Sequence, residues 1–213
     1  NCLRKLKKIK LEPDMDTEWE AKFLNVDIDK LRKTLRTSGA KLVKPERLYK
    51  RAVFFLPKGH EIEGGWIRVR DEEDKITMSL KVITNGKVDM QKEIMVVVDN
   101  YDKARQLLTE IGCVEKAYQE TKREIWHLDD VEITIDEWPY LEPYVEIEGI
   151  SEEAIKKVSN TLGFDYTQAV FGSADQVISK KYGVPEDAVN NEIPRIVFGG
   201  PNPFLTWLEK NKK

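Results

Sequence analysis

The sequence predicts an α+β fold: an eight-stranded antiparallel β-barrel with helices packed outside it and a helical carboxyl-terminal extension. Two observations predict this class. Three segments share one plan, in which an alternating strand leads into a capped amphipathic helix. Between and after them, alternating segments follow one another in hairpin order, which is typical of an antiparallel sheet or closed barrel.

The three predicted helices have matching ends. Each begins at a residue whose side chain can cap the first turn and stops at a glycine. The pairs are Asp27 with Gly39, Asp99 or Asn100 with Gly112, and Ser151 with Gly163. Because their apolar residues recur at helical spacing, we expect all three helices to pack on the outside of one sheet.

About eight strands are predicted, joined largely by short turns. The tightest turn, Thr84 to Lys87, contains Asn85-Gly86, a hairpin signal. The predicted strands are residues 18–23, 48–57, 66–71, 76–83, 90–99, 118–128, 129–138 and 144–149.

The two ends of the chain differ from this central part. The start is basic and is expected to be a flexible segment over residues 1–16. The barrel domain is predicted over 17–183. The tail, 184–213, shows short helical patterns interrupted by prolines and is expected to be an extension that packs against the sheet.

Composition limits the partners and the compartment. The chain has 213 residues with 35 basic and 38 acidic side chains, so no overall field favours nucleic acid or an anionic membrane. No apolar run approaches the roughly 20 residues that span a bilayer. Cys2 and Cys113 are too few for a disulfide framework. We therefore expect a cytoplasmic protein that binds neither nucleic acid nor membrane.

The strand "EWEAKF" places Glu18, Glu20 and Lys22 on one face and apolar residues on the other. Other strands repeat the pattern, with charges sorted by sign: Arg68 with Arg70, and Glu146 with Glu148. An ordinary solvent-facing sheet would also alternate. However, like charges two positions apart on a strand lie about 7 Å from each other and repel by roughly 2 kcal/mol at an effective dielectric near 20.

Such sorting costs stability unless a ligand compensates it. A multivalent anion would offset the arginines and lysines, since guanidinium and ammonium groups bind phosphate oxygens. A hard divalent cation would offset the carboxylates. The pattern therefore indicates a polyphosphate ligand that carries Mg²⁺ or Mn²⁺.

In their order along the chain, these motifs resemble the CYTH superfamily, the triphosphate tunnel metalloenzymes. The resemblance covers roughly residues 17–163. Its motifs are E-x-E-x-K at Glu18, Glu20 and Lys22, R-x-R at Arg68 and Arg70, the strand lysine Lys81, "KRE" with Arg123, "TIDEW" with Asp136, and "VEIEG" with Glu146 and Glu148.

The resemblance implies a barrel whose interior is a tunnel, with basic residues on the triphosphate and carboxylates on one or two divalent metals. The implied phosphate-binding residues are Lys22, Arg51, Arg68, Arg70, Lys81 and Arg123, with Lys180 or Lys181 as a further candidate. The implied metal ligands are Glu18, Glu20, Asp136, Glu146 and Glu148. The expected catalytic residues are Glu18, Glu20, Lys22 and Glu93.

The sequence departs from the family pattern in places. Many relatives have "RDTYF" where this chain has "RAVFF" after Lys50, so Arg51 keeps a phosphate-binding role while its strand loses an acid. Glu93 stands without the second acid found on that strand in many members. Lys180 and Lys181 fit an exposed helix face better than a place in the tunnel.

The resemblance leaves the reaction open. The preferred function is metal-dependent hydrolysis of the terminal phosphate of an inorganic, nucleoside or thiamine triphosphate. The alternative within the family is a class IV adenylate cyclase that converts ATP to cyclic AMP and pyrophosphate. A noncatalytic polyphosphate- or nucleotide-binding module is the alternative of another class, and a homodimer is compatible with the sequence.

Overall fold

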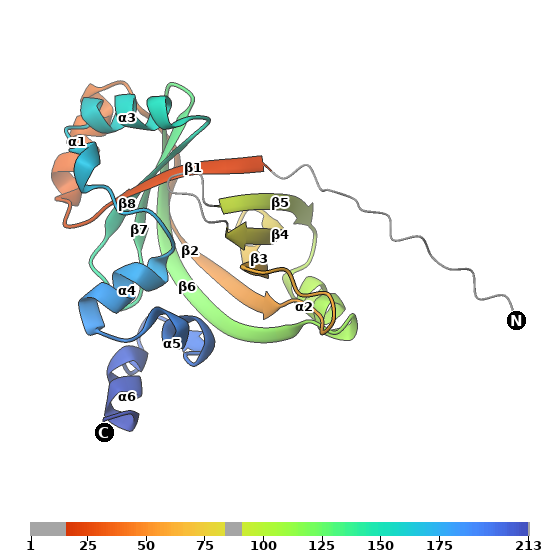
Figure 1. Ribbon diagram of the computed structural model, residues 1–213. Helices are drawn as coiled ribbons and strands as arrows, with labels where there is room; N and C mark the ends of the chain where they lie inside the picture. Colours follow the sequence, from red (N-terminus) through yellow and green to blue (C-terminus); the bar gives the residue numbers. More distant parts are fainter. Residues whose placement is uncertain (1–15, 84–90, 213) are drawn as a thin grey trace, which may run out of the picture.

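Figure 1 shows the computed structural model, which describes residues 16–83 and 91–212. The basic amino-terminal segment and the predicted Asn85-Gly86 turn lie outside the described residues. The strands are β1 (Asp16–Phe23), β2 (Lys41–Phe55), β3 (Gly65–Asp71), β4 (Ile76–Ile83), β5 (Gln91–Val98), β6 (Val114–Leu128), β7 (Val131–Glu137), β8 (Tyr144–Gly149) and β9 (Arg195–Ile196). The helices are α1 (Ile28–Thr37), α2 (Tyr101–Glu110), α3 (Glu152–Thr161), α4 (Ala174–Tyr182), α5 (Glu186–Asn191) and α6 (Pro203–Lys210).

The strands form one sheet in the order β2-β3-β4-β5-β1-β8-β7-β6-β9. In addition β2 pairs with β6, so each of β1 to β8 has a neighbour on both sides. All pairings among these eight strands are antiparallel. The predicted α+β class and the antiparallel sheet are confirmed.

Helices α1, α2 and α3 cover the outside of the sheet, as Figure 1 shows, with α1 and α3 together at one end and α2 at another. Helices α1 and α3 bury their apolar sides against β1, β6, β7 and β8, and α2 packs on β2 and β3. Asn100, the second of the two predicted caps, accepts a hydrogen bond from the Lys103 amide. In the described part of the chain, no helix combines the length and the apolar character needed to cross a bilayer.

Strands β2 and β6 are longer than predicted, with 15 residues each. The first half of β2 was not predicted as strand because it contains Pro45, and proline cannot donate a hydrogen bond to a neighbouring strand. The structure accommodates this proline with irregular register between Leu42 and Arg47. The lengthened strands pair with each other over most of their course, which brings β6 beside β2.

The carboxyl-terminal segment packs on the sheet rather than projecting from it. Its buried residues share a core with α4 and with the loop between β7 and β8. The short strand β9, which the sequence analysis missed, runs parallel to β6 beside Tyr118 and Gln119. This packing holds α5 beside the cavity that is described below.

Candidate active site inside the sheet

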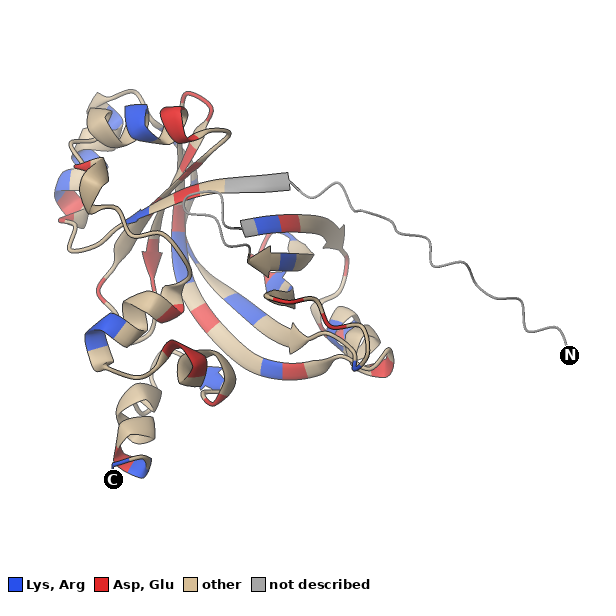
Figure 2. Cartoon of the chain, in the orientation of Figure 1, with Lys and Arg blue, Asp and Glu red and all other residues tan. Residues whose placement is uncertain are grey.

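The interior of the sheet contains a cavity of about 750 Å³. Figure 2 shows that charged residues alternate with others along the strands that surround it. Ten of the predicted site residues line this one cavity: Glu20, Lys22, Arg51, Arg68, Arg70, Lys81, Glu93, Arg123, Glu146 and Glu148.

Strand alternation explains how these charges reach the interior. In β1, Ala21 and Phe23 are buried in the outer core beneath α1 and α3, so Glu20 and Lys22 point the other way, into the cavity. The Lys22 residue is 2% exposed. A charge this deep requires compensation, which neighbouring strands or a ligand must supply.

The positive charge of Arg123 is compensated by carboxylates of the protein itself. Its guanidinium donates two hydrogen bonds to Asp136, at 2.7 and 2.8 Å, and one to Glu146 at 2.6 Å. Glu146 also lies 3.3 Å from the Lys22 ammonium. Burial alone would raise the pKa of Glu146, but Lys22 and Arg123 lower it well below its usual value. Lys22 also pairs with Glu20. These groups form one ion-pair network on β1, β6, β7 and β8.

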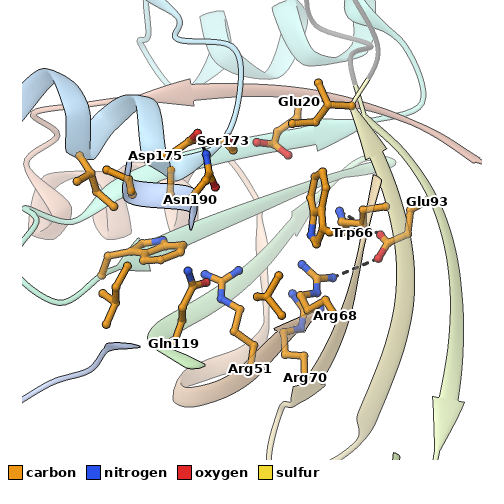
Figure 3. Close-up of a pocket in the computed structure, with 18 of the residues that line it drawn as sticks. Glu20, Arg51, Trp66, Arg68, Arg70, Glu93, Gln119, Ser173, Asp175 and Asn190 are labelled. Carbon is orange, nitrogen blue, oxygen red and sulfur yellow. Dashed lines mark hydrogen bonds and ion pairs between the residues drawn. The ribbon is translucent and has the colours of Figure 1, made fainter. Parts of the chain in front are cut away.

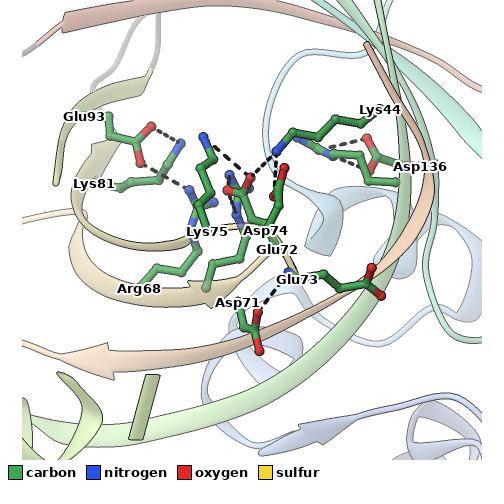
Figure 4. A network of polar contacts seen from close by, with 12 residues as sticks. Lys44, Arg68, Asp71, Glu72, Glu73, Asp74, Lys75, Lys81, Glu93 and Asp136 are labelled. Atoms are coloured by element: carbon green, nitrogen blue, oxygen red, sulfur yellow. Dashed lines mark hydrogen bonds and ion pairs between the residues drawn. The ribbon is translucent and has the colours of Figure 1, made fainter. Parts of the chain in front are cut away.

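Glu93 holds two more of the predicted phosphate-binding cations. Its carboxylate oxygens lie 3.2 Å from the Arg68 guanidinium and 3.3 Å from the Lys81 ammonium. The Cα partners Lys81 and Glu93 are opposite each other on β4 and β5. The carboxylate therefore orients both cations on the wall of the cavity (Figure 4).

Arg51 is different, because no carboxylate among the described residues pairs with it. Its buried Nε has no hydrogen-bond partner, and its guanidinium lies over the Trp138 ring, 4.1 Å from the centroid. Burial and the nearby Arg70 guanidinium lower the pKa of Arg51 to about 10. The cavity thus contains a buried cation whose donors are available to an anion.

The carboxylates at the other side of the cavity form an acidic row, which we define as Glu20, Glu132 and Glu148. Glu148 on β8 lies opposite Glu20 of β1 and opposite Glu132 of β7. Burial, and then the charge of Glu132, raise the pKa of Glu148 above its usual value. Glu132 was not among the predicted site residues, although it lies on the same charged strand face as Asp136.

The acidic row supplies the oxygen ligands that Mg²⁺ and Mn²⁺ prefer. Among the residues that the structure describes, no three His, Cys, Asp or Glu side chains come close enough to hold a metal ion by themselves. The side chain of Glu18, one predicted ligand, lies outside the described residues. A metal at the acidic row would therefore share its coordination with substrate oxygens.

Three of the predicted site residues lie outside the cavity lining. Asp136, predicted as a metal ligand, does not line the cavity; it is 1% exposed and its carboxylate binds Arg123, so it orients that guanidinium. Lys180 and Lys181 also lie outside the cavity, on the solvent side of α4. Lys181 instead pairs with Glu142 at 2.8 Å.

A buried carboxylate that the sequence analysis missed lies in the turn between β3 and β4. Glu72 is 2% exposed, and it accepts hydrogen bonds from Arg70 at 2.9 and 2.6 Å and from Lys44 at 3.2 Å (Figure 4). Lys75 is also within 3.6 Å. An acidic turn is normally solvated, so its sequence gives no signal that this carboxylate folds inward to orient Arg70.

Replacing Glu72 with Gln should lower the free energy of unfolding by roughly 3 kcal/mol at pH 7, because it leaves buried cations unpaired. Arg70, Lys75 and Lys44 outweigh burial and lower the pKa of Glu72 below 4.5. The stabilisation is therefore complete above the unfolded-state pKa and is lost as the pH falls through the folded-state value. Urea unfolding at several pH values measures this.

The matched control for this variant is Glu73→Gln, one position along the same turn. The Glu73 side chain is 55% exposed and lies 3.9 Å from Arg47, so its loss should change the free energy of unfolding by less than about 1 kcal/mol. Equal effects of the two substitutions, or a Glu72→Gln effect that does not shrink in acid, would contradict the assigned role of Glu72.

Several uncharged and aromatic residues complete the cavity. Trp66 and Trp138 line it, as do Gln119 and Tyr144. Tyr144 is 1% exposed, and burial together with Glu146 and Asp136 raises its pKa well above the usual value. On the side opposite the arginines, Ser173, Asp175 and Asn190 face the interior (Figure 3).

A comparison with known protein families shows which family has this set of strands and charged residues. The CYTH domain matches residues 16–177, which include β1 to β8 and most of the charged lining. The chain belongs to the CYTH family. No curated protein matches the sequence.

Solved structures share the fold of this chain. The PH1012 protein from Pyrococcus horikoshii OT3 has a TM-score of 0.60 and 20% identity, with 72% of this chain and 94% of that chain covered. The PH1819 protein from the same organism has a TM-score of 0.59 and 21% identity, with 77% and 99% covered. A Vibrio parahaemolyticus protein named a "putative adenylate cyclase" has a TM-score of 0.65 and 12% identity, with 77% and 98% covered.

Proposed function

We propose that this CYTH protein is a divalent-metal-dependent phosphohydrolase that cleaves the terminal phosphate of a triphosphate inside the cavity. The single observation that carries the proposal is Arg51, a cation in the sheet interior without a carboxylate partner among the described residues. Its placement beside Arg70 is unfavourable in the absence of an anion. A triphosphate would relieve this repulsion and use the free donors.

The other cations extend the phosphate site. Arg68, Arg70 and Lys81 line the same wall, and Arg123 of β6 and Lys22 of β1 line the cavity from other strands. Because Glu93, Glu72 and Asp136 already hold four of these groups in place, little side-chain ordering remains to be done when substrate binds. Preorganised cations of this kind stabilise charge that develops on the equatorial oxygens during phosphoryl transfer.

In the proposed reaction a water molecule attacks the terminal phosphorus and transfers a proton to a carboxylate of the acidic row. The bond between that phosphorus and the bridging oxygen breaks, and the bridging oxygen leaves with its electron pair on the diphosphate product. When bound, Mg²⁺ or Mn²⁺ would neutralise phosphate charge beside Glu20 and Glu148. The guanidinium groups orient the triphosphate so that its terminal phosphorus meets the attacking water.

Product analysis tests the function. Incubation with tripolyphosphate, ATP or thiamine triphosphate and Mg²⁺ or Mn²⁺ should release orthophosphate and the matching diphosphate. The control variant Lys180→Ala with Lys181→Ala should retain activity within about twofold, since both side chains lie outside the cavity. Formation of cyclic AMP and pyrophosphate from ATP would show that the reaction is cyclisation and not hydrolysis. Binding without turnover would indicate a noncatalytic module.

A further inference from the structure

The outer face of β3, β4 and β5 is apolar, and α2 covers it at one side. Two rows of directly opposed residues cross these strands on this face: Ile67, Leu80 and Ile94, and next to them Val69, Met78 and Val96. Val69 belongs to the core beneath α2 and is fully buried, whereas Val96, at the other end of its row, is 46% exposed. Helices α1 and α3 pack elsewhere, over β1, β6, β7 and β8. The outer face of β4 and β5 is therefore left partly uncovered in the described part of the chain.

Helix α2 borders this uncovered face with two more apolar side chains. Leu107 is 56% exposed and Ile111 is 57% exposed. Another flank of α2 carries Arg105, which forms an ion pair with Glu115 of β6 at 2.8 Å. Residues two positions apart on a helix point about 200° apart, so Leu107 is turned away from β6. Because β6 and β4 lie on opposite sides of β2 and β3 in the sheet, the flank that carries Leu107 is the one nearer to β4 and β5.

The exposed stripe of α2 ends in two charges of opposite sign. Lys103, Leu107 and Glu110 follow one another at helical spacing, and all three are exposed. Lys103 lies in the first turn of α2, and Glu110 is its last residue. The helix dipole favours acidic side chains in the first turn and basic ones in the last, and α2 has no basic residue in its last turn. Both charges thus lie where the dipole of their own helix disfavours them.

We propose that α2 and the neighbouring sheet face bind a second copy of this chain, with the two α2 helices antiparallel about a two-fold axis. The bound region, which we call the α2 surface, consists of six residues: Lys103, Leu107, Glu110 and Ile111 on the helix, with Leu80 and Ile94 on the sheet. In this arrangement Lys103 of each copy lies beside the partner's Glu110. The two Leu107 side chains meet near the axis.

A second copy fits the α2 surface because the surface is complementary to itself. A contact between two residues occurs twice in a two-fold interface, so two pairs of Lys103 with Glu110 form. Each pair places an opposite charge at a helix end that lacks one. The partner's α2 also covers the apolar residues of β4 and β5 that this chain's own helix leaves partly exposed. Removing that apolar area from water favours association.

The α2 surface is separate from the cavity. Arg68 and Lys81 line the cavity from the inner face of β3 and β4, and residues next to each other along a strand point to opposite faces. The six residues of the α2 surface, all within the described ranges, are absent from the cavity lining. The proposed dimer therefore leaves the cavity as it is, and the inference does not depend on the proposed function.

Sedimentation velocity of the full chain over a range of concentrations tests the proposal. The native protein should form a dimer at micromolar concentration. Leu107→Lys should raise the dissociation constant at least about 30-fold, because it removes apolar contact at the axis and places two like charges there. The control Ile150→Lys changes an apolar residue that is 76% exposed and lies before α3. This control should change the dissociation constant by less than about twofold.

Exchange of the two charges tests the antiparallel pairing. Lys103→Glu alone, or Glu110→Lys alone, brings like charges together and should raise the dissociation constant about tenfold at low salt. The double variant, Lys103→Glu with Glu110→Lys, restores opposite charges between the copies and should return the dissociation constant to the native value. Both side chains are exposed, so circular dichroism should show a native fold in all three variants.

Three results would overturn the proposal. The first is a native protein that remains monomeric up to millimolar concentration, which would leave another protein as the partner of the α2 surface. The second is a dimer that Leu107→Lys leaves intact, since the interface would then lie elsewhere. The third is a double charge variant that dimerises no better than the single variants, because the two helices would then not pack antiparallel. None of these measurements uses a triphosphate, so failure of the proposed function would not change them.

Discussion

Replacing Arg51 with Met should lower kcat/KM for a triphosphate about 100- to 1,000-fold. The substitution removes donors that bind the charge developing on the phosphate oxygens, and the loss of one such preorganised donor typically costs this much. It should not lower the free energy of unfolding, because Arg51 lies beside Arg70 and forms no ion pair with a described carboxylate. Met retains an apolar contact with Trp138. Steady-state kinetics and urea unfolding of the same protein measure both effects.

Arg123→Met provides the contrast. Arg123 is held by Asp136 and Glu146, so its removal leaves the buried Asp136 carboxylate without its ion-pair partner and should destabilise the fold by about 3–5 kcal/mol. The two variants thus distinguish Arg51, whose donors are available to a ligand, from Arg123, whose ion pairs also stabilise the fold. If Arg51→Met destabilises the protein as much as Arg123→Met, Arg51 is a structural residue and the phosphate assignment loses its main support.

Replacing Glu20 and Glu148 together with Gln should reduce metal-dependent turnover at least 100-fold. Both carboxylates belong to the acidic row, and amides of the same size bind Mg²⁺ and Mn²⁺ far more weakly than carboxylates do. Binding of tripolyphosphate without metal should be retained or strengthened, because two negative charges leave the cavity. Turnover assays and titration of free Mn²⁺ by electron paramagnetic resonance in the presence of tripolyphosphate measure these effects.

The control for the acidic row is Glu153→Gln, an exposed residue of α3. It should change neither turnover nor Mn²⁺ binding. Full activity of the Glu20→Gln, Glu148→Gln variant would show that the acidic row holds no essential metal. Equal loss of metal-free tripolyphosphate binding would instead show that the double substitution disturbs the cavity as a whole.

Strand alternation was enough to predict that the charges of β1 and β3 enter the cavity. In β1, the period of two separates Glu20 and Lys22 from Ala21 and Phe23, and the structure places the two groups on opposite faces. The reason is physical, because a residue's face is fixed locally once the strand forms. The same reasoning held for Arg68 and Arg70 on β3.

What alternation could not predict is which charges pair, since pairing depends on register between strands that are distant in sequence. Asp136 lies opposite Arg123 in the β6–β7 register and therefore binds that guanidinium rather than facing the cavity. Glu72 lies in a turn, where no periodicity applies. α5 has only six residues, too short a segment for its buried face to be read from spacing alone.

The most direct test of a triphosphate site inside the sheet is a calorimetric titration of the protein with tripolyphosphate. We expect one tripolyphosphate per chain, with an affinity that Arg51→Met lowers at least 100-fold and that Lys181→Ala, outside the cavity, changes by less than about twofold. Equal affinity for tripolyphosphate in the native protein and in the Arg51→Met variant would contradict the assignment of the cavity as the triphosphate site.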